Sequence, residues 1–131
     1  MLHYKLTNNV KFIGYVDDPS PFVRKADIAL MCSRFEAFGR VTIEAMKLGK
    51  PVIGAKSGGT TELIRNNFNG FLYTPGNYRE LAEKILTLYE HPDLLKEFGE
   101  NGKKWANEQF TEERFGREII NTLQQVLLIN K

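Results

Sequence analysis

The acidic residues Glu36 and Glu44 and two glycine-bearing turns lie within one short stretch of the chain, residues 33–63. Glu36 and Glu44 have seven residues between them, and Gly39 is one of these. The second turn, at 57–59, follows the next apolar run. A carboxylate can accept hydrogen bonds from sugar hydroxyls, and glycine lets a ligand approach the backbone closely. The combination predicts a surface that binds phosphate together with hydroxyl groups.

The segment after Gly39 shows the spacing of a helix over 39–48. The N-terminus of such a helix presents free N–H groups and the positive end of its dipole, so an anionic phosphate is the expected guest. Glu44 would lie ~7–8 Å along the axis from Gly39, whereas Glu36 precedes the helix. One acid is therefore displaced from the phosphate site in each direction. That arrangement suits a ligand with hydroxyls at both ends and phosphate between them.

The elements around these turns alternate between strand and helix. Strands are expected at 10–16, 27–32, 51–55 and 71–73, and short helices at 21–25, 39–48 and 60–65. Ser20 is expected to cap the first helix, with Pro21 at its first position. This order predicts an α/β fold, a Rossmann-like parallel sheet flanked by helices with right-handed crossovers. Such sheets bind ligands outside the carboxyl ends of their strands, where both glycine turns would converge.

The last third of the sequence is expected to be helical, over about 78–130. Its final helix carries apolar residues at intervals of three and four from 115 to 127. No linker divides the chain, so residues 1–131 are expected to form a single domain.

Composition excludes several classes of protein. With 42% apolar and 26% charged residues, a packed core is expected rather than disorder. The net charge of +2 does not indicate a nucleic-acid binder, and no apolar run is long enough to span a membrane. The N-terminus lacks the apolar core of a signal peptide. Cys32 is the only cysteine and the two histidines lie far apart, so no metal site is expected, and an intracellular location fits.

Four ordered motifs carry a family resemblance: Glu36-Ala-Phe-Gly-Arg-Val-Thr-Ile-Glu44-Ala-Met, Gly49-Lys-Pro-Val-Ile, Ser57-Gly-Gly-Thr-Thr-Glu62 and Asn69-Gly-Phe-Leu72. Together they resemble the donor-binding half of a family 4, group 1 glycosyltransferase with the GT-B fold. The acidic pair with seven residues between is the signature of that family. The resemblance extends from about Val10 to about Phe115, so the chain looks like the later part of a nucleotide-sugar-binding domain.

The resemblance implies a role for each matching residue. Glu36 would be the catalytic residue, which contacts donor sugar hydroxyls and sits near the anomeric carbon, and Glu44 would hold the ribose hydroxyls. The other expected donor-binding residues are Phe38, Gly39, Arg40, Val41, Ser57, Gly58 and Gly59. Among these, the amides of Phe38 and Gly39 would reach the sugar and diphosphate, and Val41 would lie near the nucleoside. Arg40 has a second interpretation, a helical ion pair with Glu44 four residues away.

The implied enzyme is a retaining transferase that moves a hexose-type sugar from a nucleoside diphosphate sugar to an acceptor hydroxyl, as in polysaccharide biosynthesis. It needs no metal and no cofactor beyond its donor substrate. The family's Arg/Lys pair for the leaving diphosphate and its N-terminal acceptor-binding domain are absent from this sequence. The chain by itself is therefore expected to be inactive and to bind the donor weakly. The intact enzyme is expected to be cytoplasmic, with peripheral association at the inner membrane face as a further expectation.

Other interpretations remain open. Without the family motifs, Glu36 is a solvated loop acid and 57–59 is a tight turn. The alternative function is a stand-alone, non-catalytic α/β module that binds a phosphorylated ligand or a protein partner. A third interpretation is a structural domain that docks through its last helix. The apolar face of that helix also raises the hypothesis of a dimer.

Overall fold

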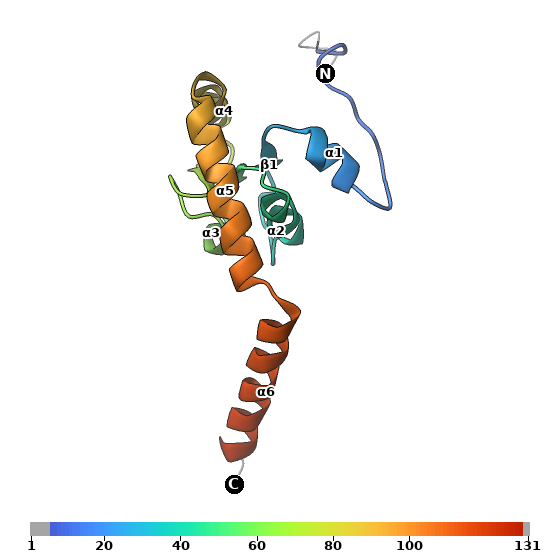
Figure 1. Cartoon of the computed structure of the whole chain (residues 1–131). Coiled ribbons are helices and arrows are strands. Elements are labelled where there is room, and N and C mark those ends of the chain that lie inside the picture. Colours follow the sequence, from blue (N-terminus) through green and yellow to red (C-terminus); the bar gives the residue numbers. More distant parts are fainter. Residues whose placement is uncertain (1–5, 130–131) are drawn as a thin grey trace.

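The computed structural model describes residues 6–129, which form a parallel sheet flanked by helices (Figure 1). Within this range the sheet has the strand order β1-β2-β3, where β1 is Ala29–Met31, β2 is Val52–Ala55 and β3 is Gly70–Tyr73. Ala29 is in register with Val52, and Val52 with Gly70. The expected α/β, Rossmann-like arrangement is therefore confirmed.

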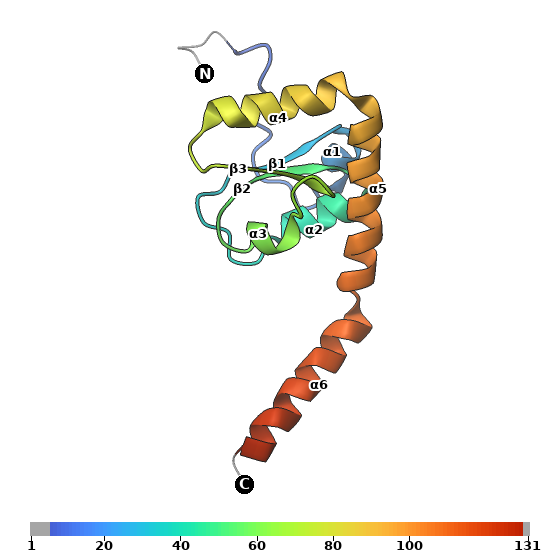
Figure 2. The ribbon, with the colours of Figure 1, turned by 90° about the vertical axis from the view of Figure 1, so that its left-hand side faces the viewer.

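The helices cover both faces of this sheet. The helices of residues 6–129 are α1 (Ser20–Lys25), α2 (Arg40–Lys47), α3 (Thr60–Leu63), α4 (Tyr78–Glu90), α5 (Pro92–Gln109) and α6 (Glu112–Ile129), of which α6 projects away from the sheet. Figure 2 shows α4 on one side of the sheet, α2 and α3 on the other, and α5 running along the end of both layers. The helices expected in the last third correspond to α4, α5 and α6, and the expected end at residue 130 lies outside the described residues.

Buried side chains form a cluster on each side of the sheet in the described chain. Val52 packs with residues of α2, α3 and α5, whereas its neighbour Ile53 packs with residues of β3, α4 and α5. Every residue of β2 is buried, as expected for a central strand of a parallel sheet. This two-sided core fixes the carboxyl ends of β1 and β2, where the glycine turns begin.

The expected strand at 10–16 is wrong, because these residues form no strand in the structure. Phe12 is 80% exposed and Tyr15 is 91% exposed. A strand is stabilised by ladder hydrogen bonds and side-chain packing against its neighbours. Within residues 6–129, β1 pairs with β2 alone, and the segment 10–16 forms no ladder with its other edge. Residues 10–16 therefore have the propensity of a strand but no neighbouring strand to pair with in the described part of the chain.

The start of α1 also differs from expectation. Ser20 is its first helical residue rather than its cap, and the Ser20 N–H donates to Asp18 Oδ1 at 2.9 Å. Hydrogen bonds from Ser20 lower the pKa of the Asp18 carboxyl below its ordinary value. The side chain that accepts from the start of this helix is therefore that of Asp18, two residues before Ser20.

Asn69 is a fully buried polar residue in the connection from α3 to β3. Its Oδ1 accepts from the Arg65 N–H at 2.8 Å, and its Nδ2 donates to the Leu63 carbonyl at 3.2 Å. We expect Asn69→Ala to lower the free energy of unfolding by about 2 kcal/mol, because two buried backbone groups lose their partner. Urea unfolding measures the change, with exposed Asn107→Ala in α5 as the matched control. Equal stability of the two variants would refute this role for Asn69.

The last helix, α6, projects away from the sheet and its covering helices (Figures 1 and 2). None of its described residues is buried. Its exposed large apolar residues are Phe115, Ile119, Ile120, Leu123, Val126, Leu127, Leu128 and Ile129. Within residues 6–129, no helix combines the length and the apolar character needed to cross a bilayer.

Candidate functional site

The loops that follow β1 and β2 are joined to each other at the carboxyl edge of the sheet. The Ser57 hydroxyl donates to the Arg34 carbonyl at 2.5 Å, and the Gly59 N–H donates to the Glu36 carbonyl at 2.7 Å. The expected convergence of the two glycine turns is therefore confirmed. The joined loops form a continuous rim before α2.

Two glycines allow this close approach of the loops. A Cβ at Gly58, whose φ is +50°, would overlap the carbonyl oxygen of Glu36, and a Cβ at Gly59 would lie 2.8 Å from the carbonyl oxygen of Ala37. The sequence suggested that these glycines open the backbone to a ligand. In the structure their missing side chains make room for the neighbouring loop instead.

Gly39 has a left-handed backbone at the N-cap of α2, with a φ of +78°. Its Cα is packed against α3, because an added Cβ would lie 2.6 Å from Leu63 Cδ1. Its N–H points to the Glu36 side chain and donates to Oε1 at 3.0 Å. The amide expected to serve a phosphate therefore already holds one anionic oxygen, that of a carboxylate.

The N-terminus of α2 offers further donors. Its first helical hydrogen bond runs from the Ile43 N–H to the Gly39 carbonyl at 3.2 Å. The N–H groups of the residues between them have no acceptor within the helix. Phe38 and Val41, on either side of this terminus, are 58% and 56% exposed. An anion placed here would meet backbone donors and the positive end of the helix dipole.

Glu44 lies on the exposed face of α2 and pairs with Arg40. Arg40 Nη2 and Glu44 Oε1 are 3.9 Å apart, and both side chains are more than half exposed. The second interpretation of Arg40, an ion pair within the helix, is therefore present in the structure. An exposed pair of this length stabilises a helix by ~0.5 kcal/mol or less, so both side chains remain free to bind a ligand.

A groove of about 640 Å³ opens beside α2. One wall carries Phe38, Arg40 and Glu44, and the opposite wall is formed by the end of α5 and the start of α6. Of the other expected site residues, Gly59 lies on the groove, whereas Glu36, Gly39, Val41, Ser57 and Gly58 do not. The groove residues that were not among the expected site residues are Ala37, Ile43, Lys47, Glu62, Leu63, Trp105, Gln109, Phe110, Thr111, Glu112, Arg114, Phe115 and Glu118.

The far wall of the groove comes from a part of the chain remote in sequence. Phe110 packs edge-on against Phe38, with ring centroids 6.4 Å apart, and against Trp105 at 5.4 Å. Trp105 is buried in the core, so it packs this wall against the body of the domain. No local pattern in the sequence links Phe110, just before the last helix, to Phe38. Only the folded chain brings residues 38 and 110 together.

The described residues contain no cluster of three or more His, Cys, Asp or Glu side chains that could hold a metal ion. The chemistry available at the rim is therefore that of backbone amides, two carboxylates and nearby cations. Amides and cations can bind an anion, and carboxylates can accept from hydroxyls.

The sequence is similar to known glycosyltransferases. Residues 1–105 match the family described as glycosyl transferases group 1. An uncharacterized glycosyltransferase of Methanocaldococcus jannaschii is 39% identical over 109 residues, which is 79% of this chain and 31% of that protein. N-acetyl-alpha-D-glucosaminyl L-malate synthase of Bacillus anthracis is 31% identical over 126 residues, 96% of this chain and 33% of the synthase.

Solved structures give the same result. HepE of Anabaena in complex with UDP and glucose is 37% identical to this chain, with a TM-score of 0.89 over 95% of this chain and 34% of that one. HepE in complex with UDP-glucose has a TM-score of 0.86 at 36% identity. The chain thus spans about a third of the length of the relatives that it matches.

Proposed function

The chain belongs to the group 1 glycosyltransferases, and we propose that it forms the part of such an enzyme that binds a nucleoside diphosphate sugar. The observation that carries this proposal is the rim before α2. There, two joined loops surround a helix N-terminus whose Gly39 amide already holds a carboxylate oxygen. The complexes of HepE with UDP and with UDP-glucose support a donor of this chemical class.

Each candidate residue has a role in this proposal. The diphosphate binds at the N-terminus of α2, where it takes the place of the Glu36 carboxylate on the Gly39 amide. Glu36, once released, accepts hydrogen bonds from the hydroxyls of the donor sugar near its anomeric carbon. Glu44, one and a half turns along the helix, accepts from the ribose hydroxyls. Phe38 contributes its backbone amide to the sugar and diphosphate, and Val41 lies near the nucleoside. Arg40 can bind the phosphate once its side chain leaves its ion pair with Glu44.

The second loop supports this site. Gly58 and Gly59 place the loop after β2 directly against the backbone of Glu36 and Ala37, and Ser57 fastens it to the carbonyl of Arg34. The roles of these three residues are therefore to hold the rim and to border the donor site. This role differs from the sequence-based expectation that Ser57, Gly58 and Gly59 contact the donor directly, because the space beside both glycines is filled by the neighbouring loop.

The reaction that we propose for the intact enzyme is hexosyl transfer with retention at the anomeric carbon. The bond from that carbon to the diphosphate oxygen breaks, a bond to the oxygen of an acceptor hydroxyl forms, and the proton of that hydroxyl passes to the leaving diphosphate. Negative charge develops on the leaving diphosphate, where preorganised N–H donors at the start of α2 stabilise it. No metal or other cofactor is part of this proposal.

An acceptor-binding domain is the partner that this reaction requires, so we expect the chain alone to bind donor without transferring sugar. We further propose a cytoplasmic enzyme, peripheral at the inner membrane face, that acts in polysaccharide synthesis. Among the relatives is a capsular polysaccharide biosynthesis glycosyltransferase of Staphylococcus aureus, 32% identical over 85% of this chain. Dimerisation through α6 stays a prediction, which light scattering with and without residues 112–129 can decide.

Titration of the ¹⁵N-labelled chain with UDP-glucose tests the proposed site. We expect saturable amide shifts confined to residues 36–44 and 57–59, with a dissociation constant on the order of 1 mM. Glucose alone serves as the control and should cause no such shifts, because it lacks the diphosphate. Shifts scattered over other surfaces would contradict the proposal. Equal responses to inorganic phosphate and UDP-glucose would favour the alternative, a non-catalytic module that binds phosphorylated ligands.

A further inference from the structure

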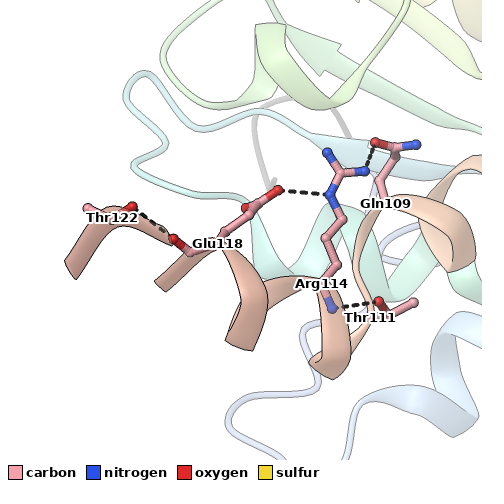
Figure 3. A network of polar contacts seen from close by, with 5 residues as sticks. All are labelled: Gln109, Thr111, Arg114, Glu118 and Thr122. Carbon is pink, nitrogen blue, oxygen red and sulfur yellow. Dashed lines mark hydrogen bonds and ion pairs between the residues drawn. The ribbon is translucent and has the colours of Figure 1, made fainter. Parts of the chain in front are cut away.

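The chain changes direction between α5 and α6 at Phe110 and Thr111 (Figures 1 and 2). Polar contacts fix this junction. Thr111 Oγ1 accepts from the Arg114 N–H at 3.1 Å, and the Arg114 guanidinium donates to Gln109 and to Glu118, as Figure 3 shows. The end of α5 and the first turns of α6 are therefore tied together around Phe110.

A third helix reaches the same junction. Lys47 Nζ, at the end of α2, donates to the Phe110 carbonyl at 2.9 Å. The Phe110 ring lies between Phe38 and Trp105 and meets both edge-on. A half-buried aromatic residue is thus held by its backbone while its ring contacts the loop before α2.

Phe38 is the residue through which this contact acts. It directly precedes Gly39, whose N–H holds the Glu36 carboxylate. Because 58% of Phe38 is exposed, little other packing is available to hold its ring. Edge-to-face aromatic pairs stabilise a defined arrangement of the two rings beyond simple burial. The Phe38–Phe110 contact therefore links the α5–α6 junction to the residue next to the Gly39 amide, in addition to the hydrogen bonds that join the two loops.

We propose that Phe110 is a positioning residue of the donor site, which holds the loop 36–39 in its binding arrangement through the Phe38 ring. That the loop binds a nucleoside diphosphate sugar rests on the proposed function, whereas the link from Phe110 to the loop does not. Phe110 touches no reacting group in this scheme. It acts from 72 residues away, across the groove between α2 and the α5–α6 junction.

Hydrogen exchange of the ligand-free chain tests this link. In Phe110→Leu we expect the Gly39 amide to exchange ~2–10-fold faster, the range that loss of one aromatic pair would give, while the amides of β2 stay unchanged. Phe110→Tyr, which keeps the ring, should restore the slower rate. Phe115→Leu is the matched control, because it removes another ring from the same groove wall on α6.

Two results would overturn the inference: unchanged exchange at Gly39 in Phe110→Leu, or equal acceleration at Gly39 and throughout β2, which would show a purely structural role. If Phe110→Leu does not fold, Lys47→Met replaces it, since it removes the hydrogen bond to the Phe110 carbonyl and keeps the aliphatic stem. Unchanged Gly39 exchange in Lys47→Met would then overturn the inference.

Titration of the wild-type chain with UDP-glucose separates this inference from the proposed function. If Gly39 exchanges selectively faster in Phe110→Leu but the wild-type chain does not bind UDP-glucose, the donor site is refuted and the link from Phe110 to the loop stands. If the wild-type chain binds UDP-glucose but Phe110→Leu does not speed exchange at Gly39, only the link from Phe110 to the loop is refuted.

Discussion

Replacing Gly58 with alanine is expected to lower the free energy of unfolding by about 3 kcal/mol and to separate the two loops of the candidate site. The new Cβ would overlap the Glu36 carbonyl oxygen, which belongs to backbone that cannot rotate away. The φ of +50° adds strain for any residue with a side chain. Overpacking of this kind costs about 1–3 kcal/mol and the backbone strain about 1 kcal/mol.

Gly76→Ala provides a matched control for this effect. Gly76 has a φ of +82°, but an added Cβ would meet nothing within 4 Å. The control therefore carries the backbone strain without the collision and should lose only about 1 kcal/mol. Urea unfolding followed by circular dichroism measures both variants. Equal losses at the two positions would mean that contact between the loops does not require a glycine at 58.

For the folded fraction of Gly58→Ala, we also expect the UDP-glucose response at residues 36–44 to disappear. The Gly59 N–H would lose its bond to the Glu36 carbonyl as the loops move apart. If the variant is too unstable to assay, Ser57→Ala removes one hydroxyl donor between the loops at a cost of about 1 kcal/mol. Unchanged binding in a variant with separated loops would show that the rim is not needed for the donor.

Glu44→Gln is expected to weaken UDP-glucose binding by ~10-fold or more, because hydrogen bonds to a charged group contribute about 1.5–3 kcal/mol. The substitution keeps the size of the side chain and removes its charge. It also removes the ion pair with Arg40, whose 3.9 Å separation and exposure make that loss small. Amide shifts or calorimetry on the donor titration give the affinity.

Glu100→Gln is the control, since Glu100 forms an equivalent exposed pair with Lys96 at 3.9 Å on α5. It should leave the affinity unchanged. A donor that lacks the ribose 2′-hydroxyl then identifies the contact, because Glu44→Gln should weaken its binding less than that of UDP-glucose. Equal weakening for both donors would refute the assignment of Glu44 to the ribose, and no weakening for either would remove Glu44 from the site.

Local pattern in the sequence determined most of the secondary structure. The apolar runs at 27–32 and 51–55 contain β1 and β2, and the spacing after Gly39 became α2. A strand buried on both faces leaves a continuous apolar run, and a helix buried on one face leaves a periodic pattern. The alternation of these elements determined the parallel sheet. The rule that ligand sites lie at carboxyl ends then predicted that the two glycine turns meet.

Tertiary structure alone decided what the same residues touch. The segment 10–16 has the composition of a strand, yet a strand exists only with a paired neighbour, and pairing is not encoded locally. Gly58 was predicted as a turn residue, but only the fold shows that the Glu36 carbonyl fills the space beside it. The contact of Phe38 with Phe110 spans 72 residues and depends on where α5 ends relative to α2. Backbone propensity and hydrophobic period act over a few residues, whereas the walls of a groove are set by how separate elements pack. The groove wall formed by the end of α5 and the start of α6 is far in sequence from α2, so local patterns could not predict it.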